Sequence, residues 1–330
     1  MKTIWFTAPR TVELLEEERP KAGPNELVVQ ARVTGISVGT EMGLYRGAEM
    51  RLSRADYNFP IRPGYEAMGT VVERGAEVTS FAVGDRVLCL GGHSQYAKVD
   101  PALTVRLPDH VSDEVATLGV LATTAQNGIR RAKIEFGDTV AVIGMGVVGI
   151  LAAQEAKLAG AGRVIGIDIN PFRLDVAQKV GIEYLVDASK EDPVARVMAI
   201  TGFGADEVIE AAGNPEAFAQ ALMLPRERGR VVILGYHVHA VQFVPGEEFW
   251  AKELDVFAAR AGGPPMGLPE AYTRWTMDRS LRYSVDLLAS GRLRVDGMIT
   301  HRFHYTEAAK AYTMVDEGSE SFVQVLFLWD

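Results

Sequence analysis

The sequence predicts an α/β protein in which a doubly wound parallel sheet is accompanied by a second, β-rich domain. Two patterns of apolar residues along the 330 residues support this prediction. Short apolar runs divided by turn residues fill the first third of the chain, which is typical of an antiparallel, barrel-like β domain. Buried β-branched runs then alternate with helical stretches, which favours a parallel sheet with helices on both faces. The length agrees with about two domains.

The first zone covers residues 1–121, where strands are expected at 26–33, 68–72 and 86–90. The second zone covers residues 122–262 and alternates strands with helices. Its strands are expected at 139–143, 163–167, 184–186, 207–210 and 230–234, and its helices at 147–158 and 173–180.

The last zone, residues 263–330, contains helices expected at 274–288 and 307–315 and a strand expected at 322–328. It is too short to build a core of its own, so we expect it to return to the sheet of the first zone. The predicted division is therefore residues 1–121 with 263–330 as a β-rich catalytic domain, and residues 122–262 as a dinucleotide-binding domain.

Composition excludes several classes of function. The formal charge is 34 − 43 = −9 and no basic block is present, which argues against a nucleic-acid partner. No apolar run is long enough for a membrane span, and residues 1–20 lack a secretory apolar segment, so we expect a cytoplasmic protein. A single cysteine excludes an intramolecular disulfide framework and any cysteine-rich zinc site.

A glycine motif marks the dinucleotide site. The expected strand 139–143 leads directly into Gly144, Gly146 and Gly149 with the spacing GxGxxG, and a helix begins at Val147 and Val148. Gly144 permits the tight turn, Gly146 lets the pyrophosphate approach the backbone, and Gly149 lets helix and strand pack closely. The first amides of the helix offer N–H groups to the phosphates.

An acidic residue at the end of the next strand completes this motif. Asp168 lies 19 residues after Gly149, where a carboxylate binds the ribose hydroxyls of NAD and repels the 2′-phosphate of NADP. Arg173 is expected to stack on the adenine or, alternatively, to soften the preference for NAD. The remaining interpretation, a glycine-rich turn in an unrelated α/β protein, does not explain this spacing.

The order of the domains, together with six short motifs, resembles the medium-chain dehydrogenase/reductase superfamily, which is alcohol dehydrogenase-like. The motifs are residues 35–41 (GISVGTE), 64–69 (GYEAMG), 84–87, 144–149, 210–213 and 299–301. The resemblance implies a GroES-like catalytic domain, a Rossmann domain and a homodimer. A narrower likeness, in residues 35–41, 63–69 and 287–302, is to the branch that contains bacteriochlorophyllide a dehydrogenase, which oxidises a secondary alcohol with NAD.

The ligands that hold the catalytic zinc in zinc-bearing members fall here on Val38, Tyr65 and Val120, and only the companion carboxylate Glu66 is kept. The loop with four cysteines for the structural zinc is also missing, and Cys89 is the only cysteine in the chain. Neither a thiolate nor an imidazole is present at these three positions, so we predict no metal site.

Without zinc, the substrate hydroxyl needs a hydrogen-bond donor and a proton acceptor. The resemblance places Thr40 where the family's proton relay begins and Tyr65 where a histidine ligand would stand, and we hypothesise a Tyr65/Thr40/Glu66 cluster. Three structural alternatives remain open: Tyr65 replaces the histidine only for packing, Thr40 caps a helix that begins near Glu41, and Glu66 is a buried carboxylate paired with an arginine. Of the six histidines, only His93 is a candidate base.

These features predict a zinc-independent, NAD-dependent oxidoreductase that interconverts a secondary alcohol, cyclic or polyol-like, and its ketone. The alternatives are a zinc-free quinone or enoyl reductase, which Asp168 disfavours, and a non-catalytic NAD-binding protein. The expected partners are a small-molecule substrate and a second copy of the chain.

Overall fold

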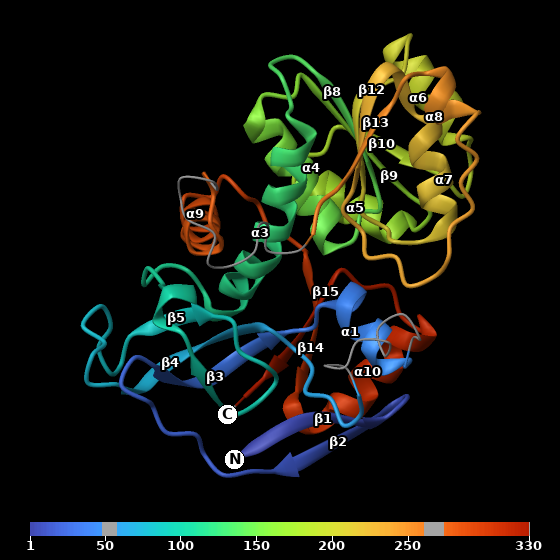
Figure 1. Cartoon of the computed structure of the whole chain (residues 1–330). Coiled ribbons are helices and arrows are strands. Elements are labelled where there is room, and N and C mark those ends of the chain that lie inside the picture. The colour runs from blue at the N-terminus through green and yellow to red at the C-terminus, as the bar shows by residue number, and fades with distance from the viewer. Residues whose placement is uncertain (48–57, 261–273, 330) are drawn as a thin grey trace. The chain divides into compact units, whose positions relative to one another are not determined.

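A computed structural model of the protein describes residues 1–47, 58–260 and 274–329. The chain divides into two compact units, shown in Figure 1. The first contains residues 1–121 and the described parts of 266–292 and 299–330, and the second contains residues 122–260 and 293–298. The predicted boundary at 262–263 lies outside the described residues. Residues 293–298, which the sequence analysis assigned to the catalytic domain, lie with the second unit.

The second unit is built on a six-stranded parallel sheet with the order β10-β9-β8-β11-β12-β13. This order reverses direction between β8 and β11, which is the signature of a doubly wound fold. The strands are β8 (Thr139–Ile143), β9 (Arg163–Asp168), β10 (Tyr184–Asp187), β11 (Ala205–Glu210), β12 (Pro225–Ile233) and β13 (Asp255–Ala258). The predicted parallel sheet is confirmed.

Helices cover both faces of this sheet, with α4 on one face and α7 and α8 on the other (Figure 1). The helices are α4 (Val147–Ala159), α5 (Pro171–Lys179), α6 (Pro193–Thr201), α7 (Pro215–Met223) and α8 (Glu248–Ala251), while α3 (Asp113–Ala132) runs from the first unit into the second. Three of these helices begin in the same way. Asn170, Asp192 and Asn214 each accept a backbone N–H at the start of α5, α6 and α7, and each is followed by proline.

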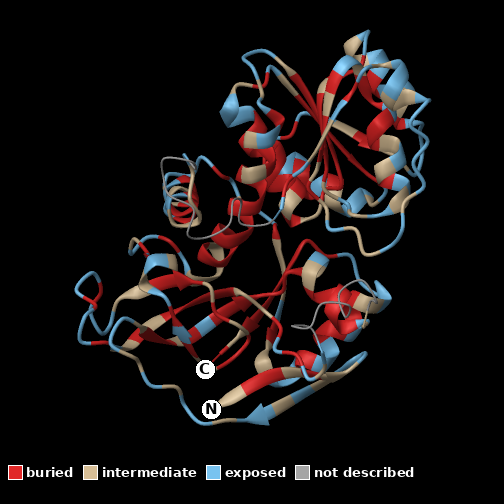
Figure 2. Cartoon of the chain, in the orientation of Figure 1, coloured by how far each residue is buried: buried red, intermediate tan, exposed pale blue. Residues whose placement is uncertain are grey.

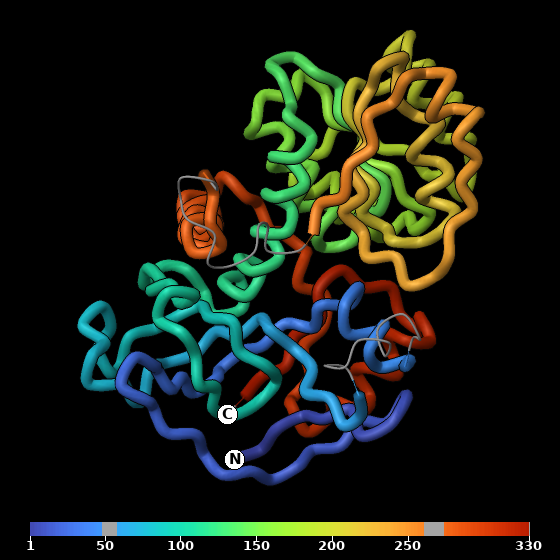
Figure 3. Tube along the Cα trace, in the orientation of Figure 1, coloured from blue at the N-terminus to red at the C-terminus, as the bar shows by residue number. Residues whose placement is uncertain are grey.

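The first unit is organised around a seven-stranded sheet with the order β14-β15-β3-β4-β5-β7, and β6 also pairs with β3. Its strands are β3 (Leu27–Gly35), β4 (Glu66–Arg74), β5 (Arg86–Cys89), β6 (Tyr96–Val99), β7 (Thr104–Arg106), β14 (Ile299–His304) and β15 (Gln324–Leu328). The predicted return of the last zone is confirmed, since β15 pairs with β3. Figure 3 shows both ends of the chain in this unit. The sheet is not wholly antiparallel, because β14 and β15 run parallel.

A hairpin that the sequence analysis did not predict, β1 (Lys2–Ala8) with β2 (Thr11–Glu16), also belongs to the first unit. The other elements in the described part of this unit are α1 (Val38–Tyr45), α9 (Met277–Ala289), α10 (Ala308–Glu317) and two short 3₁₀ turns at Pro101–Leu103 and Tyr305–Glu307. Each unit has its own buried interior, shown in red in Figure 2.

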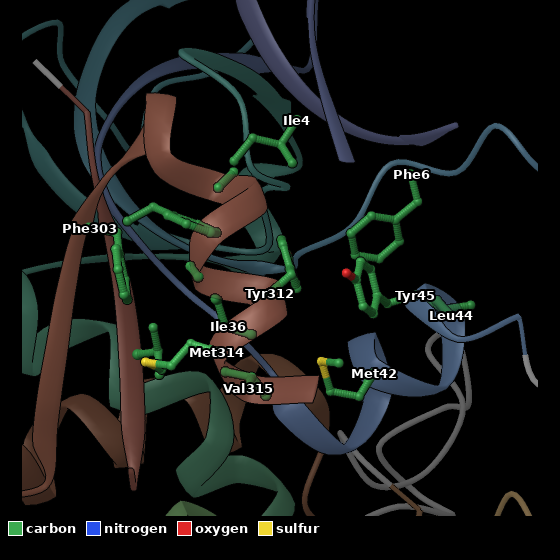
Figure 4. Packing of buried hydrophobic residues seen from close by; sticks show 14 of the residues in the cluster. Ile4, Phe6, Ile36, Met42, Leu44, Tyr45, Phe303, Tyr312, Met314 and Val315 are labelled. Carbon is green, nitrogen blue, oxygen red and sulfur yellow. The ribbon is translucent and has the colours of Figure 1, made fainter. Parts of the chain in front are cut away.

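Aromatic side chains hold α1 and α10 against the N-terminal hairpin. Tyr312 of α10 lies edge-on to Phe6, with 4.8 Å between ring centroids, and stacks on Tyr45 of α1 at 5.6 Å. Figure 4 shows these rings in one cluster with Ile36 and Met42. This packing fixes α1, which carries part of the candidate site.

Candidate functional site

The predicted glycine turn follows β8 in the second unit. Gly144 has a φ of +93°, a conformation that glycine adopts without strain. A Cβ on Gly149 would lie 1.7 Å from the carbonyl oxygen of Gly144, so only glycine lets α4 begin this close to the strand. Gly146 differs, because no described neighbouring atom lies within 4 Å of a Cβ built there. The turn therefore leaves its open side at Gly146, beside the start of α4 at Val147 and Val148.

Asp168 ends β9 and is buried, with 6% of its surface exposed. Its carboxylate accepts the backbone N–H of Met145 at 2.6 Å and that of Asn170 at 2.8 Å. Arg173, on the first turn of α5, lies 4.0 Å from the same carboxylate. The structure thus brings the glycine turn, Asp168 and Arg173 together at the carboxyl ends of β8 and β9, where α/β sheets bind their ligands.

Glu210, at the end of β11, supports the same edge of the sheet and was not among the predicted site residues. This fully buried carboxylate accepts the backbone N–H groups of Ala212 and Gly213 at 2.8 and 2.7 Å and contacts His237 at 2.8 Å. The backbone of Ala212 in turn faces Gly144, where a Cβ would meet its nitrogen at 2.8 Å. The sequence signal that could have identified Glu210 is the run Glu-Ala-Ala-Gly, which begins at the last residue of this strand.

The three positions that match zinc ligands all lie in the first unit. Val38 begins α1 and is half-buried, Tyr65 precedes β4 and is half-buried, and Val120 is buried in α3. A valine supplies no donor atom, and a neutral phenol is a poor substitute for thiolate or imidazole. Within the described ranges, no group of three or more His, Cys, Asp or Glu side chains could hold a metal ion. These residues do not fit the zinc of the family.

Tyr65 has a hydroxyl neighbour that the sequence analysis did not predict. Its phenol oxygen forms a hydrogen bond with the Ser37 hydroxyl. Burial and the nearby Glu66 raise the pKa of Tyr65, while the hydroxyls of Ser37 and Thr40 oppose that rise. The phenol therefore stays protonated at neutral pH and can donate a hydrogen bond.

Glu66 begins β4, directly after Tyr65, and is fully buried. Its Oε2 accepts a hydrogen bond from Gln324 of β15 at 3.3 Å, and among the described residues its Oε1 has no hydrogen-bond partner. Burial, followed by the charge of Glu41, raises the pKa of Glu66 well above its ordinary value. The structure gives it an amide neighbour in place of the arginine that one alternative supposed.

Thr40 lies in the first turn of α1 and is half-buried. The helix begins at Val38 with Ser37 in the N-cap position, so Thr40 is not the cap residue that the alternative interpretation required. Its hydroxyl lowers the pKa of the Tyr65 phenol. The predicted cluster of Tyr65, Thr40 and Glu66 is thus brought together, and Ser37 is its additional member.

His93 lies in a neighbouring group of buried polar side chains, which shares Glu41 with the backbone N–H of Ser37. It is 1% exposed, its Nδ1 lies 2.7 Å from the Thr34 hydroxyl, and its Nε2 lies 3.1 Å from Glu41. Tyr312 also donates to Glu41, and Trp329 donates to Thr34 at 2.9 Å. Both ring nitrogens of His93 are engaged within the protein, which favours a supporting role over that of a base.

Comparison with known proteins agrees with both units. Residues 23–109 match the alcohol dehydrogenase GroES-like domain, and residues 147–277 match the zinc-binding dehydrogenase family. L-threonine 3-dehydrogenase of Pyrococcus furiosus is 30% identical over 355 residues, covering 96% of each chain. D-guloside 3-dehydrogenase of Escherichia coli is 29% identical over 350 residues, covering 98% of this chain and 99% of its own.

A solved structure of a putative zinc-binding dehydrogenase from Sinorhizobium meliloti, bound to NADP, superposes with a TM-score of 0.82. It is 26% identical and covers 99% of each chain. No helix within the described part of the chain is long and apolar enough to cross a membrane.

Proposed function

We propose that this chain, which belongs to the medium-chain dehydrogenase/reductase (alcohol dehydrogenase-like) superfamily and is an oxidoreductase of that superfamily, works without zinc. In this proposal it interconverts a secondary alcohol, cyclic or polyol-like, and its ketone, with NAD as the hydride carrier. The names of its relatives, which act on threonine and on a guloside, support an alcohol substrate. The likeness to the bacteriochlorophyllide a dehydrogenase branch stays a prediction.

One observation carries the proposal: a protonated, half-buried phenol stands where zinc-bearing members have a histidine ligand. The raised pKa of Tyr65 makes its hydroxyl a hydrogen-bond donor at neutral pH. Such a donor stabilises an oxygen that gains negative charge as its carbon loses hydride. Glu66, whose pKa is also raised, is suited to hold the proton that the alcohol releases. Thr40, whose hydroxyl lowers the pKa of Tyr65, completes the proposed cluster.

The second unit supplies the groups that we propose for the cofactor. NAD, when bound, accepts the hydride at its nicotinamide ring. The amides of Gly146, Val147 and Val148 at the start of α4 would face the pyrophosphate, because the first amides of a helix have no partner within it. Asp168 would bind the ribose hydroxyls and repel a 2′-phosphate, which supports a preference for NAD over NADP.

The experiment measures cofactor, metal and turnover on one preparation. The purified protein is titrated with NADH and NADPH, its metal content is measured, and a panel of secondary alcohols, polyols, enones and quinones is followed at the nicotinamide absorbance. We expect tighter binding of NADH, alcohol turnover that chelator treatment does not abolish, and less than stoichiometric zinc.

Other outcomes of this experiment identify the alternatives. Preferred NADPH binding with enone or quinone reduction would point to a reductase. Binding of NADH without turnover of any compound would indicate a non-catalytic protein. Loss of turnover after zinc removal, restored by added zinc, would contradict zinc independence.

We also propose that the protein is a cytoplasmic homodimer. Among the described residues, the strand β13 is at the edge of its sheet and pairs on one side only, and Trp250 in the nearby helix α8 is 74% exposed. Sedimentation of the purified chain tests the dimer, and a sedimentation coefficient of the monomer at micromolar concentration would exclude it.

A further inference from the structure

A chain of buried hydrogen bonds crosses the first unit and ends at the start of α1. Trp329 donates its indole N–H to the Thr34 hydroxyl at 2.9 Å, and the same hydroxyl lies 2.7 Å from Nδ1 of His93. Nε2 of His93 lies 3.1 Å from the carboxylate of Glu41. All four side chains are buried, so each of these hydrogen bonds is strong and an unpaired polar group among them would be costly.

The two ends of this chain fix its direction. An indole N–H can only donate, and an ionised carboxylate can only accept. Because Trp329 donates to Thr34, the Thr34 hydroxyl keeps its own hydrogen for Nδ1 of His93. A neutral imidazole that accepts at Nδ1 carries its hydrogen at Nε2, which here faces Glu41. The hydrogens therefore run from Trp329 through Thr34 and His93 to Glu41.

The other protonation states of His93 leave a hydrogen without an acceptor. A charged imidazole, or a neutral one with its hydrogen at Nδ1, would donate to the Thr34 oxygen that already accepts from Trp329. The hydroxyl hydrogen of Thr34 would then have no acceptor among the hydrogen bonds of the described residues. Since an unpaired buried donor is costly, the bonding pattern favours the neutral ring with its hydrogen at Nε2.

Glu41 connects this chain to the phenol of Tyr65. Its Oε1 accepts the backbone N–H of Ser37 at 2.8 Å, and its Oε2 also accepts the hydroxyl of Tyr312. Ser37 is the N-cap residue of α1, yet its side chain makes no capping hydrogen bond. Its hydroxyl instead bonds the phenol of Tyr65. A displacement of Glu41 would therefore reach the phenol through a single residue.

We propose that Glu41 and His93 are positioning residues, which hold Ser37 so that its hydroxyl donates to the Tyr65 oxygen. The proposal rests on the proposed function, in which Tyr65 gives its own hydrogen to the substrate oxygen. The two roles are compatible, because a phenol oxygen accepts one hydrogen bond while its hydrogen serves another partner. His93 touches no reacting atom in this role and takes no proton from the substrate.

The first test locates the hydrogen of His93 and needs no turnover. Long-range proton–nitrogen NMR spectra of the full chain, with ¹⁵N-labelled histidine, distinguish the two neutral forms of an imidazole from each other and from the charged form. The signals of His93 are those that His93→Gln lacks. We expect a neutral ring with its hydrogen at Nε2 at neutral pH.

The second test measures turnover in Glu41→Gln. In either orientation of the new amide, its NH₂ group faces a donor, which is the N–H of Ser37 at one oxygen site and Nε2–H of His93 at the other. We expect kcat to fall about 10- to 100-fold while the Kd for NADH is unchanged. The control is Tyr312→Phe, which removes a donor to the same carboxylate but leaves its bonds to Ser37 and His93. We expect this control to keep kcat.

The third test uses matched threonine variants at the far end of the chain. Thr34→Val removes the hydroxyl that joins Trp329 to His93, and Thr104→Val removes another buried hydroxyl of the same unit, which donates to the Asp100 carbonyl at 2.8 Å. We expect both to unfold at lower temperature and only Thr34→Val to lower kcat, by about threefold or more. Thr34→Ser keeps the hydroxyl and should restore kcat.

The three tests separate the possible failures. A wild-type His93 that is charged or carries its hydrogen at Nδ1 overturns the proposal. Wild-type kcat in Glu41→Gln overturns it too, and so does an equal kcat in Thr34→Val and Thr104→Val. If Glu41→Gln does not fold, the wild-type spectrum and the threonine variants decide. A wild type that turns over no alcohol overturns the proposed function, and the spectrum still decides the direction of the chain.

Discussion

The backbone N–H of Met145 donates a hydrogen bond to the carboxylate of Asp168 over 2.6 Å. This bond joins the glycine turn after β8 to the end of the neighbouring strand β9. The Asp168 side chain is held further by the N–H of Asn170. The acidic group is therefore oriented before any nucleotide arrives, which reduces the entropy lost on binding.

Asp168→Asn is expected to weaken the preference for NADH over NADPH about tenfold or more. The change keeps the shape of the side chain and removes the charge that repels a 2′-phosphate. Fluorescence titration with both nucleotides measures the ratio of the two Kd values. The control is Asp175→Asn, which removes one negative charge at an exposed position of α5. An equal effect of both variants would mean that net charge alone sets the preference.

Gly146→Ala and Gly149→Ala are expected to separate binding from folding. A Cβ at Gly146 enters free space in the described structure, so the fold should keep its unfolding temperature while NADH affinity falls about tenfold or more. A Cβ at Gly149 collides with the Gly144 carbonyl, which should cost about 3 kcal/mol or more of stability. Thermal unfolding with and without NADH measures both. Full NADH affinity in Gly146→Ala would remove this turn from the cofactor site.

Tyr65→Phe is expected to lower kcat about 100-fold, because it removes a single donor to the reacting oxygen. Tyr312→Phe is the matched control. It deletes another buried phenol of the same unit, one that donates to Glu41 and touches no proposed reacting group. We expect Tyr312→Phe to lower the unfolding temperature and to keep kcat. Steady-state kinetics with the best alcohol of the panel provides the comparison, and near-normal turnover of Tyr65→Phe would exclude Tyr65 from the mechanism.

Glu155 in α4 is buried, and neither carboxylate oxygen has a hydrogen-bond partner among the described residues. Burial raises its pKa well above the ordinary value, although Arg130 opposes this. The folded protein therefore keeps a proton that the unfolded chain loses above about pH 4.5. The free energy of unfolding falls as the pH rises from about 4.5 toward the raised pKa of Glu155.

Glu155→Gln, which cannot ionise, should match the wild type near pH 4 and exceed it by more than about 1 kcal/mol at pH 7. Denaturant unfolding at several pH values tests this expectation. The control is Glu183→Gln, an exposed residue of the same unit, for which we expect little change. A wild type and Glu155→Gln variant with parallel pH dependence would contradict the raised pKa.

The second unit could be predicted closely because its signals are local. The strand at 139–143 and the three glycines after it determine the turn within eleven residues, and β8 has the bounds that the sequence predicted. Its helices also begin at local signals, such as Asn170 followed by Pro171. Prediction of the strand ends was less accurate, since β12 begins at Pro225 and not at residue 230.

The first unit was harder to predict because its contacts join distant residues. Gln324 reaches Glu66 across 258 positions, and Tyr312 reaches Glu41 across 271. The family motifs pointed to Tyr65, Thr40 and Glu66, but nothing in a single sequence distinguishes Ser37 from other serines near a helix start. The β1–β2 hairpin was missed because only scattered positions in β2 are covered.

The position of β15 has a consequence for synthesis on the ribosome. β15 is synthesised after both β3 and β14 but lies between them, so the sheet of the first unit lacks an interior strand until residue 328 has emerged. The parallel sheet of the second unit needs only residues 139–258. The nucleotide-binding sheet can therefore assemble on the nascent chain before β15 is available to pair with β3. During that interval the edge of β3 that β15 later covers is exposed and can bind a chaperone. A chain truncated before β15 would keep this edge exposed.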